Sequence, residues 1–458
     1  MTRRTTRRRF MQESALAGLG FWAAGGLAFA RDGKSANDQI QIASIGVSGK
    51  GSSDVDGASH VGKIVALCDV DDDFLSNKAT KFPEAAKFND YREMLDKMGD
   101  KIDAVTVSTP DHTHAPASIT AMKKGKHVYC QKPLTHTVAE AREMRETAAK
   151  MKVATQMGNQ GSAADGLREA VEIIQSGAIG PVREAHVWTN RPIWPQAPGV
   201  MARPKDEQPI PKNVHWDLWL GVAPNRPYHE GYHPFNWRGW LDFGTGAIGD
   251  MACHTANLPY RALKLGLPTS IVAEAGDVNP ETYPSWAQIV FQFPEREQMP
   301  AVKFTWYEGH KNGQKVLPPD DLVKIMEDVR KKHDIKDSGS GSLLIGERGM
   351  LFSPDDYGAR YFLLPEDQFR DYKKPEPTLP RNGRGDDGMK AEWIAAVRGG
   401  PAPYSNFEIA SRLTESMLLG DVAMRMTGKK LEYDGKNMKI TNNDDADKLL
   451  KTDYRTGW

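Results

Sequence analysis

Asp250 and His254 stand four positions apart in the small-residue run TGAIGDMACHTANLPYRAL, residues 245–263. A spacing of four places two side chains on the same face of a helix, one turn apart. A histidine titrates near neutrality and can exchange a proton with a substrate, and a nearby carboxylate can orient its ring. The alternative is structural, with Asp250 capping the helix and His254 bonded inside the core.

A glycine-rich stretch, IGVSGKGSSDV, follows the first predicted strand and could hold a dinucleotide. Gly46 and Gly51 fit the first and third positions of the dinucleotide fingerprint. Its second position is Ser48, and the extra glycine is displaced to Gly49. We therefore expect Gly46, Val47, Ser48 and Gly49 to bind the cofactor, although an ordinary strand, turn and helix would read similarly.

Asp69 ends the second predicted strand, 18 residues after Gly51. A carboxylate at about this distance accepts hydrogen bonds from both ribose hydroxyls of a dinucleotide. Three further aspartates at 71–73 would repel a 2′-phosphate. The sequence therefore predicts NAD rather than NADP.

The fold class is predicted from short β-branched runs that alternate with helical stretches. Strand-like runs occupy residues 39–47, 63–70, 102–110 and 126–133, and helical runs include 115–125 and 138–152. This alternation indicates a parallel sheet covered on both faces, an α/β Rossmann dinucleotide-binding domain over residues 38–180. Ligands of such sheets bind beyond the carboxyl ends of the strands, where TPDHTH (109–114) and QKPL (131–134) stand.

Beyond residue 180 the pattern changes to strands at 182–190, 269–278, 286–293 and 301–307 without regular intervening helices. This indicates an α+β domain with a largely antiparallel open sheet over residues 181–400. A helical run at 406–428 predicts a helix that returns to the first domain within 401–434, followed by a tail at 435–458. The polar insertions at 203–216 and 309–341 could form lids over the site or surface arms.

These motifs, in this order, resemble the family of glucose–fructose oxidoreductase, inositol dehydrogenase and their rhizopine-catabolism relatives. The resemblance extends from about Gln39 to Asp434. In that family a Glu-Lys-Pro motif follows the fifth strand, where this chain has Gln131-Lys132-Pro133. The second domain supplies an Asp-x-x-x-His helix that faces the nicotinamide, which Asp250 and His254 match.

The resemblance implies a catalytic set of Lys132, Asp250 and His254. By this analogy His254 exchanges a proton with a substrate hydroxyl, Asp250 orients it or binds a neighbouring hydroxyl, and Lys132 polarises the same oxygen. The missing glutamate removes a carboxylate that would tune the pKa of Lys132. Cofactor contacts are expected from Gly46, Val47, Ser48, Gly49, Asp69, Thr109, Pro110, His112, Gln131, Lys132 and Gln160.

Substrate contacts are expected around the same end of the sheet. Asn159 and Gln160 lie in QMGNQGS, which the resemblance places beside the active site, although they could equally be turn residues. Six tryptophans lie between residues 188 and 240 and could stack on a sugar or pack loops. The expected substrate-binding residues are Lys132, Asn159, Trp237, Arg238, Asp250 and His254.

Histidines and acids also allow a metal site to be considered. Asp250 and His254 could combine with His229 and His233, or Asp111 could combine with His112 and His114. No close pair has a recognised zinc spacing, so we expect no metal, with His112 lining the nicotinamide side of the cofactor pocket.

The first thirty residues predict export. TRRRFMQ at 6–12 precedes a weakly apolar run and the small-x-small site Ala28-Phe29-Ala30, the layout of a twin-arginine-type signal peptide (1–30) cleaved after Ala30. We expect the export machinery as a partner, a periplasmic location and no membrane span in the mature chain. A formal net charge of zero argues against nucleic-acid binding.

The sequence as a whole predicts an exported NAD-dependent sugar or polyol oxidoreductase, assembled as a homo-oligomer. Free NAD is scarce outside the cytoplasm, so we expect it to be tightly bound and recycled. One alternative is a glycoside hydrolase or lyase that oxidises a sugar transiently with bound NAD. The other is a non-catalytic sugar-binding relative. Substrate identity does not follow from the motifs.

Overall fold

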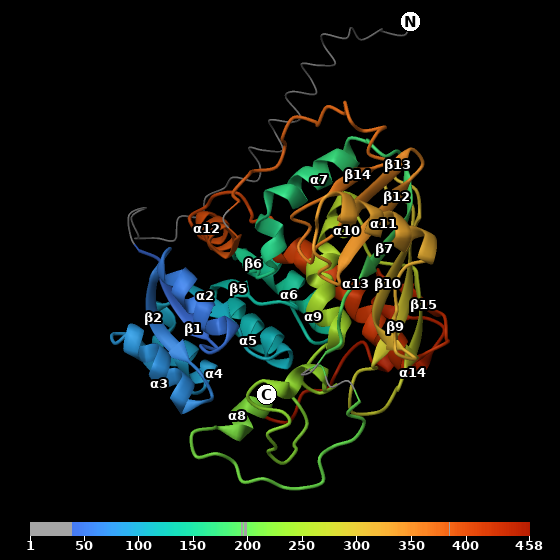
Figure 1. Cartoon of the computed structure of the whole chain (residues 1–458). Coiled ribbons are helices and arrows are strands. Elements are labelled where there is room, and N and C mark those ends of the chain that lie inside the picture. The colour runs from blue at the N-terminus through green and yellow to red at the C-terminus, as the bar shows by residue number, and fades with distance from the viewer. Residues whose placement is uncertain (1–38, 194–195, 197–198, 384) are drawn as a thin grey trace, which may run out of the picture.

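The computed structural model describes residues 39–193, 196, 199–383 and 385–458. Two sheets stand side by side, with the long helix α13 (Phe407–Arg425) between them (Figure 1). The predicted signal peptide, its cleavage site after Ala30, and Trp194 lie outside the described residues.

The first sheet has six parallel strands in the order β3-β2-β1-β4-β5-β6. This is the strand order of a Rossmann fold and confirms the predicted fold class of the first domain. Two short strands, β3 and β6, were not expected from the sequence. The strands are β1 (Gln41–Ile45), β2 (Lys63–Cys68), β3 (Ala86–Phe88), β4 (Ala104–Val107), β5 (His127–Cys130) and β6 (Thr155–Met157).

Some of the helices that accompany this sheet begin with side-chain caps. Thr137 and Glu140 form a reciprocal capping box at the start of α6, and the Asp71 side chain caps α3. The helices are α2 (Lys50–Ser59), α3 (Asp72–Lys81), α4 (Tyr91–Met98), α5 (Asp111–Lys123), α6 (Val138–Met151) and α7 (Asp165–Gln175).

The second sheet is mixed and mostly antiparallel, with β7 and β10 as a parallel pair. Its main order is β14-β13-β12-β7-β10-β9-β8-β15-β16, and β11 pairs with β10. Strand β15 extends this sheet beside β8, so the 401–434 segment serves both domains. The strands are β7 (Val182–Trp188), β8 (Ser270–Gly276), β9 (Trp286–Phe293), β10 (Val302–Lys311), β11 (Gln314–Lys315), β12 (Gly341–Gly346), β13 (Gly349–Ser353), β14 (Phe362–Leu364), β15 (Leu431–Asp434) and β16 (Lys439–Ile440).

The expectation that this sheet lacks intervening helices is wrong for the 309–341 insertion. It contains α11, whose Met326 and Val329 pack with Trp188, Tyr307 and other apolar side chains of the sheet. The amphipathic helix therefore covers a face of the sheet and does not close the cofactor site. This helix, α11, spans Asp320–Lys332, and α12 (Gly385–Val397) packs on the first domain. The remaining helices are α8 (Trp216–Leu220), α9 (Gly246–Thr255), α10 (Asn257–Ala262) and α14 (Asp444–Lys448).

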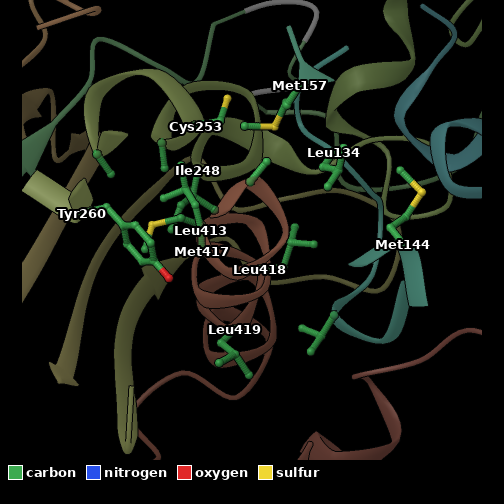
Figure 2. Close-up of a cluster of buried hydrophobic side chains, with 14 of the residues drawn as sticks. Leu134, Met144, Met157, Ile248, Cys253, Tyr260, Leu413, Met417, Leu418 and Leu419 are labelled. Carbon is green, nitrogen blue, oxygen red and sulfur yellow. The ribbon is translucent and has the colours of Figure 1, made fainter. Parts of the chain in front are cut away.

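Helix α13 joins the two domains through one continuous core. It packs on α6 of the first domain and on α9 and β8 of the second. Figure 2 shows Leu413, Met417 and Leu418 of this helix among side chains from both sides, including Met157 and Ile248. Each fully buried aliphatic side chain of this kind contributes about 1.5–3 kcal/mol. The packing fixes α9, and hence Asp250, relative to the first sheet.

No helix in the described part of the chain has the length and apolar character needed to cross a membrane.

Candidate cofactor and substrate site

A cavity of about 310 Å³ opens at the carboxyl ends of β1, β2, β4 and β5. This is the place where doubly wound sheets bind ligands. Most of the predicted site residues line it together with groups from the second domain. The lining includes Gly46, Ser48, Gly49, Asp69, Thr109, Pro110, Asp111, Gln131, Lys132, Trp237, Arg238 and Asp250.

The glycine loop has the backbone geometry that the fingerprint requires. Gly46 has a φ of +78°, and a Cβ there would lie 2.5 Å from the Ser108 carbonyl oxygen. Gly49 has a φ of +52°, so the displaced glycine occupies a left-handed position directly before α2. No side chain caps that helix, which leaves its first N–H groups available to a phosphate beside the cavity.

Asp69 is positioned by two backbone hydrogen bonds at the end of β2. Val47 N donates to its Oδ2 at 2.8 Å and Asp71 N to its Oδ1 at 3.0 Å. Burial raises the pKa of Asp69 to about 6, although the backbone donors oppose this. Val47 thus supports Asp69, and its own side chain is buried. The loop and the carboxylate together fit the pyrophosphate and ribose of a dinucleotide.

Lys132 and Asp250 meet in the cavity wall as an ion pair between the two domains. Lys132 Nζ donates to Asp250 Oδ1 at 2.6 Å and to the Asp250 carbonyl oxygen at 2.9 Å. Burial disfavours both charges, but the attraction outweighs it, raising the pKa of Lys132 and lowering that of Asp250 to about 2. Gln196 Nε2 donates to the other oxygen, Oδ2, at 2.5 Å.

His254 lies one turn beyond Asp250 on α9, as the spacing predicts, but it is not among the cavity-lining residues. Its ring packs edge-on against Tyr357, with the centroids 5.1 Å apart. Burial, aided by the charge of Lys132, lowers the pKa of His254 to about 3, so the ring is neutral at pH 7. Its buried Nδ1 has no hydrogen-bond partner among the described residues.

Gln131 replaces the expected glutamate, and a different carboxylate lies beside it. Gln131 Nε2 donates to Asp54 Oδ2 at 2.8 Å, and Ser108 Oγ donates to the same oxygen at 2.9 Å. Asp54 Oδ1 accepts from Lys50 at 2.7 Å and from Lys390 of α12 at 3.0 Å. The buried Asp54 thus connects the glycine loop, β4, β5 and α12.

His112 does not line the cofactor pocket, which corrects the sequence expectation. Its Nδ1 lies 3.2 Å from the Phe243 carbonyl oxygen and its Nε2 lies 3.0 Å from that of Trp219. Burial lowers the pKa of His112 to about 3. His114, two residues along α5, lines the cavity instead, because neighbours at this spacing point to different helix faces.

Asn159 is also held within the protein rather than offered to a ligand. Its Nδ2 donates to the Cys253 carbonyl oxygen, and its Oδ1 accepts from Ser162 and Ser405. The residue is fully buried, so a substrate cannot reach this amide without displacing those partners. Gln160 is likewise absent from the cavity lining.

Several lining residues were not among the predicted cofactor or substrate contacts. Asp111 accepts a hydrogen bond from Thr245 at 2.7 Å, and burial raises its pKa to about 7. Lys50, Phe74 and Trp458 also line the cavity. Asp111 and Lys50 stood inside recognised motifs, whereas nothing in the sequence indicated that Trp458 lies beside the first sheet. No cluster of metal ligands occurs in the described residues.

Comparison with known families now decides the class. Residues 40–159 match the oxidoreductase family with an NAD-binding Rossmann fold, and residues 194–299 match the C-terminal alpha/beta domain of the same family. The chain belongs to the Gfo/Idh/MocA oxidoreductase family. Its first domain is an NAD-binding Rossmann domain, as the glycine loop and Asp69 indicated.

Curated relatives include both dehydrogenases and glycosidases. A levoglucosan dehydrogenase of Pseudarthrobacter phenanthrenivorans is 27% identical over 202 residues, 44% of this chain and 42% of that protein. A glycosyl hydrolase family 109 protein of Shewanella pealeana is 33% identical over 122 residues, 24% of this chain. The matched region spans about a quarter, 26%, of the length of that protein.

Solved structures share the fold across most of the chain. The WlbA dehydrogenase of Bordetella pertussis, in complex with NADH and UDP-GlcNAcA, aligns with a TM-score of 0.58 at 15% identity. The alignment covers 87% of this chain and 99% of that one. An aldose-aldose oxidoreductase of Caulobacter crescentus gives a TM-score of 0.54 at 14% identity, covering 86% and 100% of the two chains.

Proposed function

We propose that this protein is an NAD-dependent oxidoreductase that acts on a hydroxyl group of a sugar or polyol. The observation that carries the proposal is the Lys132–Asp250 ion pair in the wall of the cavity that also contains the glycine loop and Asp69. The NAD, when bound, accepts hydride from the carbinol carbon or returns it to a carbonyl. The named levoglucosan dehydrogenase supports a carbohydrate substrate.

The chain's own groups supply the proton chemistry that this reaction needs. The Lys132 ammonium lies where it can stabilise the developing alkoxide of a substrate hydroxyl. Asp250 holds Lys132 through its Oδ1. Its Oδ2, which accepts a hydrogen bond from Gln196 in this structure, accepts one from a neighbouring substrate hydroxyl instead. We assign the proton exchange to His254, which is neutral at pH 7 and whose Nδ1 has no hydrogen-bond partner among the described residues. Because His254 does not line the cavity, this role requires its ring to reach the substrate once NAD and the sugar are bound. Trp237 and Arg238, which also line the cavity, bind the sugar.

We also propose that NAD stays tightly bound and is recycled within the protein, and that the protein is exported with NAD already bound. The twin-arginine-type signal peptide at 1–30 supports translocation of a folded, loaded protein to the periplasm. A second substrate, or the oxidised sugar itself, then takes back the hydride, so no free NAD is needed. We also propose that the protein works as a homo-oligomer.

The test is direct. The purified chain is loaded with NAD and mixed with a panel of aldoses, inositols and anhydrosugars, while the absorbance of the reduced nicotinamide is followed. We expect reduction with at least one sugar and none with His254→Ala, which should still bind NAD. A His254→Ala variant with unchanged turnover would remove this residue from the mechanism.

The glycosidase alternative is favoured by one observation, the similarity of the first domain to glycosyl hydrolase family 109 proteins. Transient oxidation of a sugar carbinol acidifies the adjacent C–H and permits elimination of the glycosidic oxygen. This reaction would release the aglycone of a nitrophenyl glycoside without net reduction of NAD. In deuterated water it would also introduce deuterium at the carbon next to the oxidised one, which simple hydride transfer does not.

A further inference from the structure

One end of the cavity is enclosed by residues that lie far from the first domain in the sequence. Asp69 and the start of α2 assign this end to the adenosine half of the cofactor. Beside Phe74, which follows Asp69 on α3, the wall contains Trp219, His233 and Trp458. These three aromatic residues come from the second domain and from the last described segment.

The first of these segments, residues 213–238, is here called the arm. It is attached to the first domain at the turn after β2. Asp72 N donates to the Asn213 carbonyl oxygen at 2.8 Å, and His215 N donates to the Val70 carbonyl oxygen at 2.9 Å. Asn213 Nδ2 also donates to Asp71 Oδ1 at 3.0 Å. The acidic residues after Asp69 therefore serve as an anchor for the arm.

His233 completes the arm's contact with this turn. Its ring lies 6.3 Å from that of Phe74, centroid to centroid, and its Nε2 lies 3.8 Å from Asp71 Oδ2. Trp219 packs edge-on against His233 at 6.0 Å. The arm thus places the rings of Trp219 and His233 in the lining of the same cavity as Asp69.

Trp458 closes the remaining side and is held in place by arginines. The Arg92 guanidinium stacks over its ring at 3.8 Å. Arg455 pairs with Asp217 of the arm and donates to the Gly221 carbonyl oxygen at 3.0 Å and to Asn225 at 2.7 Å. Trp458 is consequently tied both to the start of α4 and to the arm.

We propose that the arm and Trp458 form an aromatic cover that binds the adenine base and retains the dinucleotide in the cavity. This inference rests on the proposed function, because it requires NAD as the ligand. A base has a flat π face, and stacking on aromatic side chains binds such faces with appreciable affinity. Release of the cofactor then requires the Arg455–Asp217 contact and the arm's backbone bonds to open.

If the cover binds adenine, substitutions in it should weaken binding of the adenosine half of NAD and leave binding of the nicotinamide half unchanged. Trp458→Ala should weaken binding of ADP-ribose about tenfold and speed NAD release by a similar factor, as loss of one stacking partner implies. Nicotinamide mononucleotide, which lacks adenine, should bind the variant and the unchanged chain equally. Asp217→Ala, at an exposed position, should accelerate NAD release without removing any ring from the wall.

The experiment is calorimetric titration of the full chain with ADP-ribose and nicotinamide mononucleotide, together with stopped-flow displacement of bound NADH. Arg183→Ala is the matched control, because Arg183 pairs with Glu347 on an exposed edge of the second sheet. Unchanged ADP-ribose affinity and NADH release in both Trp458→Ala and Asp217→Ala would overturn the cover while leaving the proposed function intact. Failure of the unchanged chain to bind NAD or ADP-ribose would overturn both.

Discussion

Lys132 belongs to the first domain and Asp250 to the second, and the two side chains form an ion pair in the cavity wall. The motif order predicted both residues, because strand ends and a helix spacing of four depend on local sequence. The motif could not indicate where His112 points, since that depends on the carbonyl groups of Phe243 and Trp219. It also could not show that Gln131 binds the buried Asp54, because that contact joins residues 77 positions apart.

Removal of the Lys132 charge should abolish most of the activity. In Lys132→Met the developing alkoxide loses its cation, so we expect kcat/KM to fall about 10²- to 10³-fold. Asp250 would also lose the partner that holds its pKa at about 2. Steady-state rates with a sugar that the panel assay identifies as a substrate check this, and NAD binding should persist. Lys123→Met, an exposed lysine paired with Glu143, is the control and should leave the rate unchanged.

Protonation of Asp69 should weaken NAD binding. Its pKa is raised to about 6 by burial, so the carboxylate that accepts ribose hydroxyls is lost as the pH falls through about 6. We expect affinity to be lower at pH 5 than at pH 8, and Asp69→Asn to bind NAD weakly at both. Fluorescence titration at the two pH values measures this. An equal affinity at pH 5 and pH 8 in the unchanged chain would contradict the assignment.

At the scale of elements, the strands β1, β2, β4 and β5 and the helices α5, α6 and α13 were predictable from composition and periodicity. Helix α11 was not, because its segment is polar on most sides and becomes helical through Met326 and Val329 on one face. Helix α12 also escaped the sequence analysis, although it delivers Lys390 to the buried Asp54. Both depend on partners that are distant in the chain.

The Asp54–Lys390 contact should couple α12 to the glycine loop. Asp54→Ala leaves the Lys390 ammonium buried without its carboxylate, which should cost about 3–5 kcal/mol of unfolding free energy. The double variant Asp54→Ala, Lys390→Met removes both charges and should recover a large part of that loss. Urea denaturation of the two single variants and the double variant gives the coupling energy. Additive effects would show that the two residues act independently.

At the scale of the whole molecule, the two domains share a core through α13, so stability depends on groups at that junction. Glu308 of β10 is buried, and within the described part of the chain its hydrogen-bond donor is Trp306 Nε1, at 2.7 Å. Asp421 of α13 lies near enough to interact electrostatically with it. The relative placement of the domains was not predictable, because it depends on side-chain packing rather than on strand or helix periodicity.

The contribution of buried Glu308 to stability should be lost as the pH rises from about 4 to about 8. Burial raises the pKa of Glu308 to about 8, above its value in an unfolded chain, so the folded state keeps a proton that the unfolded state releases. This contribution is complete below about pH 4 and is lost as the pH rises to about 8. In Glu308→Gln the unfolding free energy should depend less on pH across this range, by more than about 1.4 kcal/mol. Urea transitions at pH 5 and pH 9 measure the difference.

The cavity that contains the glycine loop, Asp69 and Lys132 together has a kinetic consequence. If the dinucleotide stays under its aromatic cover, the donor sugar must leave before the acceptor enters the same space beside Lys132. Initial rates should then follow a double-displacement pattern, with parallel lines in reciprocal plots. Each substrate should also inhibit competitively at high concentration, because each can occupy the cavity in the oxidation state meant for the other.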